Sequence, residues 1–187
     1  MSAKTTITTK VEVKLLLGVS DTTNDTLFDK LCAWITEYIQ TYCGKKFIET
    51  TITDEIYNSS DFKFSFWLNN APLASITKFE KKQSDGTWKT LVLDTDYEAN
   101  LSNGFIRMYE IDNGIADLKI SYKTLENVPA DLEMVATQLV VSAYNRRSNQ
   151  GVVNESLGEA SIQWGALTSD DQKKTLDRHT RASSYMI

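Results

Sequence analysis

The sequence predicts an α+β protein: a small bundle of about three to four helices with an inserted antiparallel β lobe and an extended C-terminal arm. Helical spacing of apolar residues marks two long segments, alternation with a period of two fills the stretch between them, and the tail has no apolar stripe. We therefore expect a helical core (1–46 and 128–147), a β lobe (47–127) and an arm with a short helix (148–187).

The first helix is expected just after Thr9. Residues 10–14 alternate like a strand, whereas Leu15-Leu16-Leu17 followed by Gly18 reads like the end of a helix. Thr9 with Glu12 three residues later forms a capping-box pattern, which favours a short helix that ends at Gly18.

The second helix is predicted by an amphipathic stripe. Capping residues at 21–24 precede it, and Gly44 follows its last turn. The apolar stripe comprises Leu27, Phe28, Leu31, Ile35, Tyr38, Ile39 and Tyr42.

The β lobe is predicted from alternation and turn signals. Phe62, Phe64, Phe66 and Leu68 share one face, and Trp67 lies on the other. The turns Ser84-Asp85-Gly86, Asn103-Gly104 and Asn113-Gly114 divide the lobe into six or seven strands.

The third helix is expected to have Pro129 in its first turn, with Asp131 and Glu133 at its positive end and Arg146 and Arg147 at its negative end. Its apolar stripe comprises Leu132, Val135, Ala136, Leu139, Val140, Ala143 and Tyr144.

The arm from Ser148 to Gly165 has no periodic face and is predicted to be a loop that finds its partners elsewhere. Ser169 and Gln172 begin a last short helix in which Leu176 is the only apolar residue before Ala182. We therefore expect this helix to need a neighbouring subunit, and a chain cut after Gly151 to fold as a monomer.

Composition sets limits on function. Hydrophobic residues make up 41% of the 187 residues, with 2 Pro and 8 Gly, so the chain can form a core and is not disordered. The net charge of −5 disfavours tight binding to duplex DNA. The sequence has no apolar run of about 20 residues and no apolar stretch near the N-terminus, so we expect no membrane span, no signal peptide and synthesis in the cytoplasm.

Candidate chemistry is sparse. Cys32 and Cys43 lie eleven residues apart in one helix, about 16 Å along its axis, so they cannot form a disulfide. His179 is the one histidine, which excludes a multi-histidine metal site within one chain and fits a cation at a helix C-terminus. Asp94 and Asp96 fit turn roles. We expect no catalytic residue, metal or cofactor.

The order of these segments resembles the head–tail connector, or adaptor, proteins of tailed bacteriophages and prophages. Residues 37–47, Glu-Tyr-Ile-Gln-Thr-Tyr-Cys-Gly-Lys-Lys-Phe, are similar to the family's E-Y-I-x-x-Y-x-G-R-x-F helix exit, although 122–127 depart from its usual Tyr-x-Ala-Gly-Tyr turn. The other matching segments are Val11–Val19, Ala71–Ile76, Val128–Leu132, Asn145–Arg147, Glu155–Ile162 and Leu176–Arg181.

The resemblance implies a non-enzymatic virion protein of the neck, present in the host cytoplasm during assembly. It implies a homo-oligomeric ring, usually of twelve subunits, beneath the portal protein, formed from chains that can be monomeric when free. Such a ring extends the channel through which genomic DNA passes non-specifically, and it docks a stopper or tail completion protein. Portal or subunit contacts are expected from Glu155, Ser156, Leu157, Ile162, Trp164, Leu176, Arg178 and Arg181.

Two alternatives remain open. Trp67 and Trp88 could stack on sugars in a carbohydrate- or cell-wall-binding module, or in a wall-degrading enzyme carried on a phage particle. A different ring of the neck, such as a stopper or tail completion protein, is disfavoured by the helical frame.

Overall fold

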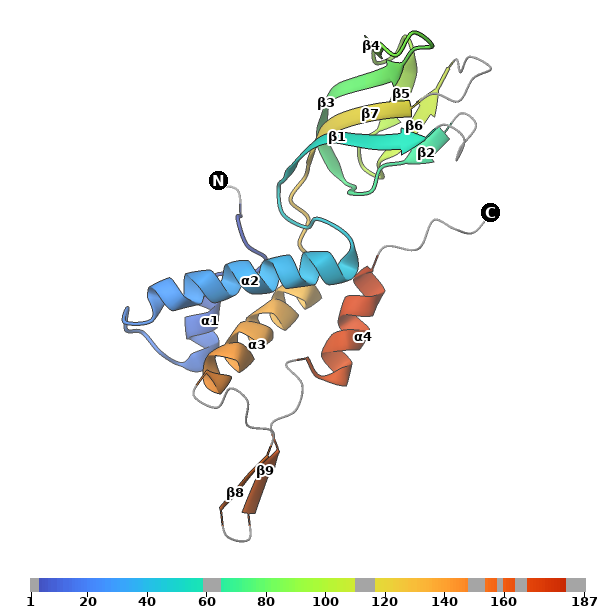
Figure 1. Cartoon of the computed structure of the whole chain (residues 1–187). Helices are drawn as coiled ribbons and strands as arrows, with labels where there is room; N and C mark the ends of the chain where they lie inside the picture. The colour runs from blue at the N-terminus through green and yellow to red at the C-terminus, as the bar shows by residue number, and fades with distance from the viewer. Residues whose placement is uncertain are drawn as a thin grey trace. The chain divides into compact units, whose positions relative to one another are not determined.

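The computed structural model describes residues 4–58, 65–109, 117–147, 154–157, 160–163 and 168–180, and the chain divides into two compact units (Figure 1). The helical unit consists of Thr5–Lys45 and Val128–Ile187. The β unit consists of Lys46–Asn127 together with Met1–Lys4. Because the β unit is inserted between α2 and α3, two chain segments connect it to the helical unit.

Helix α1 (Lys10–Leu17) begins and ends where local signals predict. Thr9 and Glu12 form both bonds of a capping box, and Gly18 ends the helix in the left-handed conformation with φ 69°. The helical alternative for this segment is therefore confirmed.

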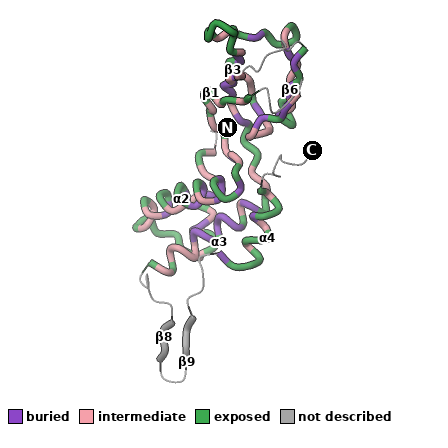
Figure 2. The backbone as a smooth tube through the Cα atoms, turned by 45° about the vertical axis from the view of Figure 1, so that its right-hand side comes forward, coloured by how far each residue is buried: buried purple, intermediate pink, exposed green. Residues whose placement is uncertain are grey.

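Helices α2 (Asp25–Cys43) and α3 (Ala130–Arg146) form the frame of the helical unit. Gly44 ends α2 at φ 62°, as expected, whereas Pro129 lies at the N-cap, one residue before the predicted first turn. Figure 2 shows the buried stretches along α3. The buried apolar residues of the unit are Ile7, Val13, Phe28, Cys32, Ile35, Ile39, Cys43, Leu132, Val135, Ala136, Leu139, Val140 and Leu176.

Polar residues also lie inside this core. The backbone N–H of Ile7 donates to Thr36 Oγ1 at 2.9 Å, and the hydroxyls of Thr8 and Thr137 are 2.7 Å apart. These bonds attach the N-terminal segment to both long helices while satisfying buried hydroxyls. The apolar stripe predicted for α2 did not include the buried Thr36 and Gln40.

The described part of the β unit contains seven strands in two antiparallel sheets. One sheet has the order β1-β7-β3-β4, and the other has the order β2-β6-β5. The strands are β1 (Thr51–Asn58), β2 (Ser65–Trp67), β3 (Leu73–Lys82), β4 (Trp88–Thr90), β5 (Tyr97–Asn100), β6 (Phe105–Met108) and β7 (Asp117–Thr124).

The two sheets share one apolar core. Phe79 of the larger sheet lies 6.4 Å from Phe66 and 4.7 Å from Tyr97 between ring centroids, and both of these partners belong to the smaller sheet. The predicted alternation is confirmed where the structure describes it, since Phe66 and Leu68 are buried and Trp67 is exposed. Phe62 and Phe64 lie outside the described residues.

Glycine turns separate the strands as predicted. Gly86 at φ 84° lies between β3 and β4, and Gly104 at φ 72° lies between β5 and β6. The third expected turn, Asn113-Gly114, lies outside the described residues.

Hydrogen bonds join the two chain segments by which the β unit is connected to α2 and α3. The N–H of Asn127 donates to the carbonyl of Phe47 at 2.9 Å, and the N–H of Thr50 donates to Thr124 Oγ1 at 2.8 Å. Nearby, the hydroxyl of Tyr122 donates to Glu55 Oε2 at 2.6 Å. Burial is the larger cause that raises the pKa of Tyr122, and this hydrogen bond raises it further. The base of the lobe is thus fixed by bonds between residues far apart in the sequence.

The arm differs from the predicted loop. Strands β8 (Asn154–Leu157) and β9 (Ala160–Gln163) pair as an antiparallel two-stranded sheet, with Glu155 opposite Ile162. Four-residue strands are too short to give a reliable periodic signal, which is why the sequence did not reveal them. Helix α4 (Asp170–His179) follows with the expected capping box of Ser169 and Gln172.

Candidate assembly surfaces of the helical unit

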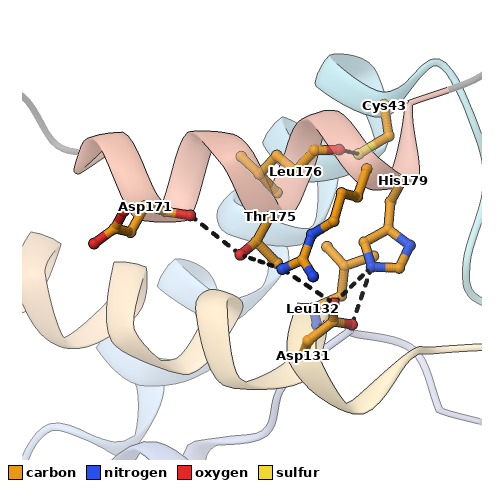
Figure 3. A network of polar contacts seen from close by, with 8 residues as sticks. Cys43, Asp131, Leu132, Asp171, Thr175, Leu176 and His179 are labelled. Carbon is orange, nitrogen blue, oxygen red and sulfur yellow. Dashed lines mark hydrogen bonds and ion pairs between the residues drawn. The ribbon is translucent and has the colours of Figure 1, made fainter.

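Helix α4 is packed against its own subunit. Leu176 is fully buried, and its carbonyl accepts a hydrogen bond from Cys43 Sγ at 3.7 Å, at the end of α2 (Figure 3). This corrects the expectation that Leu176 serves a neighbouring subunit or the portal. One apolar residue is sufficient because it reaches the α2–α3 core, which the sequence pattern of α4 alone does not show.

A histidine and a carboxylate join α4 to α3. His179 Nε2 lies 2.9 Å from Oδ2 and 3.0 Å from Oδ1 of Asp131, and Arg178 approaches the same carboxylate at 3.9 Å (Figure 3). The hydrogen bond with His179 lowers the pKa of Asp131, although burial acts in the opposite direction. The predicted helix-end cation therefore has a specific carboxylate partner in the first turn of α3.

Hydrogen bonds to α2 and α3 extend along the rest of α4. Tyr42 donates to Asp177 Oδ1 at 2.7 Å, which raises the Tyr42 pKa, and Gln172 donates to Gln138 at 3.1 Å. In front of α4, the hydroxyl of Tyr38 lies 3.2 Å from that of Thr168. Both tyrosines were expected in the apolar stripe of α2, and the structure shows that their hydroxyls hold α4.

These contacts argue against the expectation that a chain cut after Gly151 folds as a monomer. Such a chain would lose Leu176 and the polar partners of Asp131 and Tyr42, which would uncover part of the helical core. The C-terminal segment is therefore part of the subunit fold at α4.

The remaining predicted contact residues fall into three groups. Arg178 is exposed on α4, with its guanidinium near Thr175 and Asp131. Trp164 and Arg181 lie outside the described residues. The paired strands β8 and β9 contain the others, namely Glu155, Ser156, Leu157 and Ile162.

Helix α1 presents an exposed apolar patch that the sequence analysis did not identify as a surface. The patch consists of Val11, Leu15 and Leu16, whose exposed fractions are 70%, 83% and 52%. Val13 on the same helix is fully buried. The available signal was that the apolar residues of α1 fall on more than one side of the helix, so that burying Val13 leaves the others uncovered.

The tryptophans considered for sugar stacking lie on edge strands of different sheets. Trp67 on β2 is 59% exposed and packs beside Phe105 at 5.0 Å between ring centroids. Trp88 on β4 lies under the Lys119 ammonium, 4.4 Å from the ring centroid. Each indole thus has its own partner within its sheet.

Asp94 and Asp96 have the turn roles that the sequence predicts. Asp96 Oδ2 accepts a bond from the N–H of Val92 at 2.7 Å, and Asp94 has a left-handed φ of 63° in the same turn. Among the described residues, no group of three or more His, Cys, Asp or Glu side chains is arranged to hold a metal ion. Cys32 and Cys43 are both buried and unbridged, as predicted.

Within the part of the chain that the structure describes, no helix combines the length and the apolar character needed to cross a membrane.

The family model of the head completion proteins matches residues 6–184. The chain therefore belongs to the head completion protein family, and it has the structural role of a head–tail connector. No curated protein sequence matches the chain at a significant level.

Solved structures share the fold at low identity. A chain from the neck of an empty gene transfer agent particle, computed with C6 symmetry, is 14% identical and superposes with a TM-score of 0.56, covering 92% of this chain and 89% of that one. A chain from the virion of the native gene transfer agent is 12% identical with a TM-score of 0.57, covering 93% and 89%. The α+β fold predicted from the sequence is thus found in neck and virion structures.

Proposed function

We propose that this chain forms a ring, of twelve subunits when complete, beneath the portal of a DNA-filled capsid. The observation that carries the proposal is the match to the head completion protein family over residues 6–184. A similar fold occurs in a particle neck computed with C6 symmetry, which supports a cyclic arrangement. The ring extends the DNA channel and docks a stopper or tail completion protein.

The protein acts in the virion neck without catalysis, and it occupies the host cytoplasm while particles assemble. Its net charge of −5 suits a channel component, because few excess cations are present to bind phosphates and release counterions. Genomic DNA then passes without being held.

The β8–β9 hairpin carries the contact with the portal or the next subunit. An isolated two-stranded hairpin is only marginally stable in water, so it gains order from a third strand or an apolar surface. The proposed contact residues of this arm are Glu155, Ser156, Leu157 and Ile162, with Trp164 beside them in the sequence. Arg178 in α4 and Arg181, which follows it in the sequence, complete the set.

The first test is the mass of the purified protein, alone and mixed with the portal of the same phage, by light scattering with negative-stain imaging. We expect a ring, or a monomer that adds to the portal in a fixed ratio. A monomer that does not bind the portal would contradict the proposal. In that case, saturable glycan binding that is lost in Trp67→Ala would favour a sugar-binding module.

A second variant tests the role of the arm. A chain in which residues 151–167 are replaced by a short Gly/Ser linker keeps α4 and its contacts with Asp131 and Tyr42. We expect this variant to fold as the wild type does and to lose attachment to the portal. Attachment at wild-type strength would show that the contact lies elsewhere.

A further inference from the structure

Helix α1 is held in a fixed orientation on the helical unit. Lys10 Nζ lies 2.9 Å from Asp29 Oδ2, and Lys14 Nζ lies 2.9 Å from Asp25 Oδ1, both on the first turns of α2. The N-terminal segment is bonded to Thr36 and Thr137 on the two long helices. Because Val13 is locked in the core, α1 cannot rotate to bury the exposed patch of Val11, Leu15 and Leu16.

The patch is apolar, and the lysines beside it are already paired. With Lys10 and Lys14 bound to aspartates of the same subunit, the surface offers little free positive charge to a phosphate backbone. Its chemistry therefore matches an apolar protein surface better than DNA.

The size of the patch indicates how it is used. Three aliphatic side chains expose on the order of 300 Å² of apolar surface, close to the largest patch on a typical monomer. A stable pair of proteins usually buries about 800 Å² on each partner. The patch is thus too small to hold two subunits together alone, so it would form one part of a larger contact.

We infer that the α1 patch is covered by a second copy of this chain, as one side of the contact between neighbouring subunits. This inference rests on the proposed ring. In a cyclic ring the contact is heterologous, so each subunit offers two different surfaces, one to each neighbour. Helix α1, which carries the patch, contacts the start of α2, whereas α4 contacts its end, so the two helices lie toward opposite ends of α2 (Figure 1).

Photo-crosslinking tests the occupant directly. A photoreactive residue, p-benzoylphenylalanine, replaces Leu15 in an equal mixture of ¹⁴N and ¹⁵N chains, which are assembled on the portal, irradiated and digested. We expect crosslinked peptides that join light and heavy copies of this chain. A crosslink to portal or to another neck protein would overturn the inference and leave the proposed function intact. If the wild-type chain forms no ring on the portal, the proposed function fails and the inference fails with it.

A matched pair of variants tests the need for the patch. Leu15→Ser should fold like the wild type and lower ring formation at least tenfold at a fixed protein concentration. Met134→Ser removes another exposed aliphatic side chain, on α3, and should form rings as the wild type does. Rings formed by Leu15→Ser at wild-type concentration would contradict the inference.

Discussion

His179 Nε2 lies 2.9 Å from Asp131 Oδ2, and this contact joins the last residue of α4 to the first turn of α3. The two groups are 48 positions apart in the sequence. Negative charge near a helix N-terminus is favourable, which suits Asp131 in the first turn of α3, and a protonated His179 would likewise suit the C-terminus of α4.

Asp131→Asn should make the free energy of unfolding vary less with pH in the acidic range. The pKa of Asp131 is lower in the folded protein than in the unfolded chain, where it is about 4. The ionised carboxylate therefore stabilises the fold above about pH 4, and this stabilisation is lost as the pH falls through the folded-state pKa. We expect a deficit of up to about 1 kcal/mol at pH 7, because the pair is partly exposed. Urea unfolding at several pH values should show the deficit disappear in acid.

The control for this variant is Asp171→Asn, since Asp171 is on the exposed side of α4 and pairs only with Lys174 among the ion pairs that the structure describes. Because Asp171 lies in the first turn of α4, this variant should show only a small loss from the helix dipole, below that of Asp131→Asn. A deficit of Asp131→Asn that persists unchanged at pH 3 would show that charge is not the cause.

Leu176→Ala should destabilise the isolated protein. Truncation of a fully buried leucine leaves a cavity and costs about 2–5 kcal/mol. Urea unfolding of the monomer measures the loss, and limited proteolysis should cut the α4 segment first. Leu15→Ala, at an exposed position, should change stability by less than about 0.5 kcal/mol. Equal stability of the two variants would mean that α4 is not docked on its own subunit.

Gly104→Ala should cost more than Gly44→Ala. Both glycines have positive φ, so a side chain at either position is strained by about 1–2 kcal/mol. At Gly44 a Cβ meets nothing within 4 Å, whereas at Gly104 it would lie 2.9 Å from the Cβ of Ala71. Chemical unfolding of the two variants compares them, and an equal loss would show that the turn at Gly104 adjusts freely.

Both cysteines should resist thiol reagents in the folded protein. Burial raises the pKa of the Cys32 and Cys43 thiols to about 11, so they stay protonated at pH 8 and are shielded by the helices. Mass spectrometry after iodoacetamide treatment should find unmodified protein, and both sites should react in urea. Rapid labelling of Cys43 alone would indicate that α4 opens easily, because Cys43 lies against Leu176.

Local signals in the sequence determined the elements of this protein. The capping box at Thr9, the glycines at positions 18, 44, 86 and 104, and the alternation around Phe66 each act within a few residues, so they can be read without knowledge of the fold. The resemblance to the connector family also came from the order of short segments, which the family match over residues 6–184 confirms.

Tertiary structure decided the contacts between distant segments. The burial of Leu176, the pairing of His179 with Asp131 and the hydroxyl bond from Tyr42 to Asp177 all depend on α4 returning to α2 and α3. The sheet order β1-β7-β3-β4 and the exposure of Leu15 likewise follow from which surfaces meet. Such contacts join residues tens of positions apart, and their free energy depends on packing geometry that no local pattern encodes.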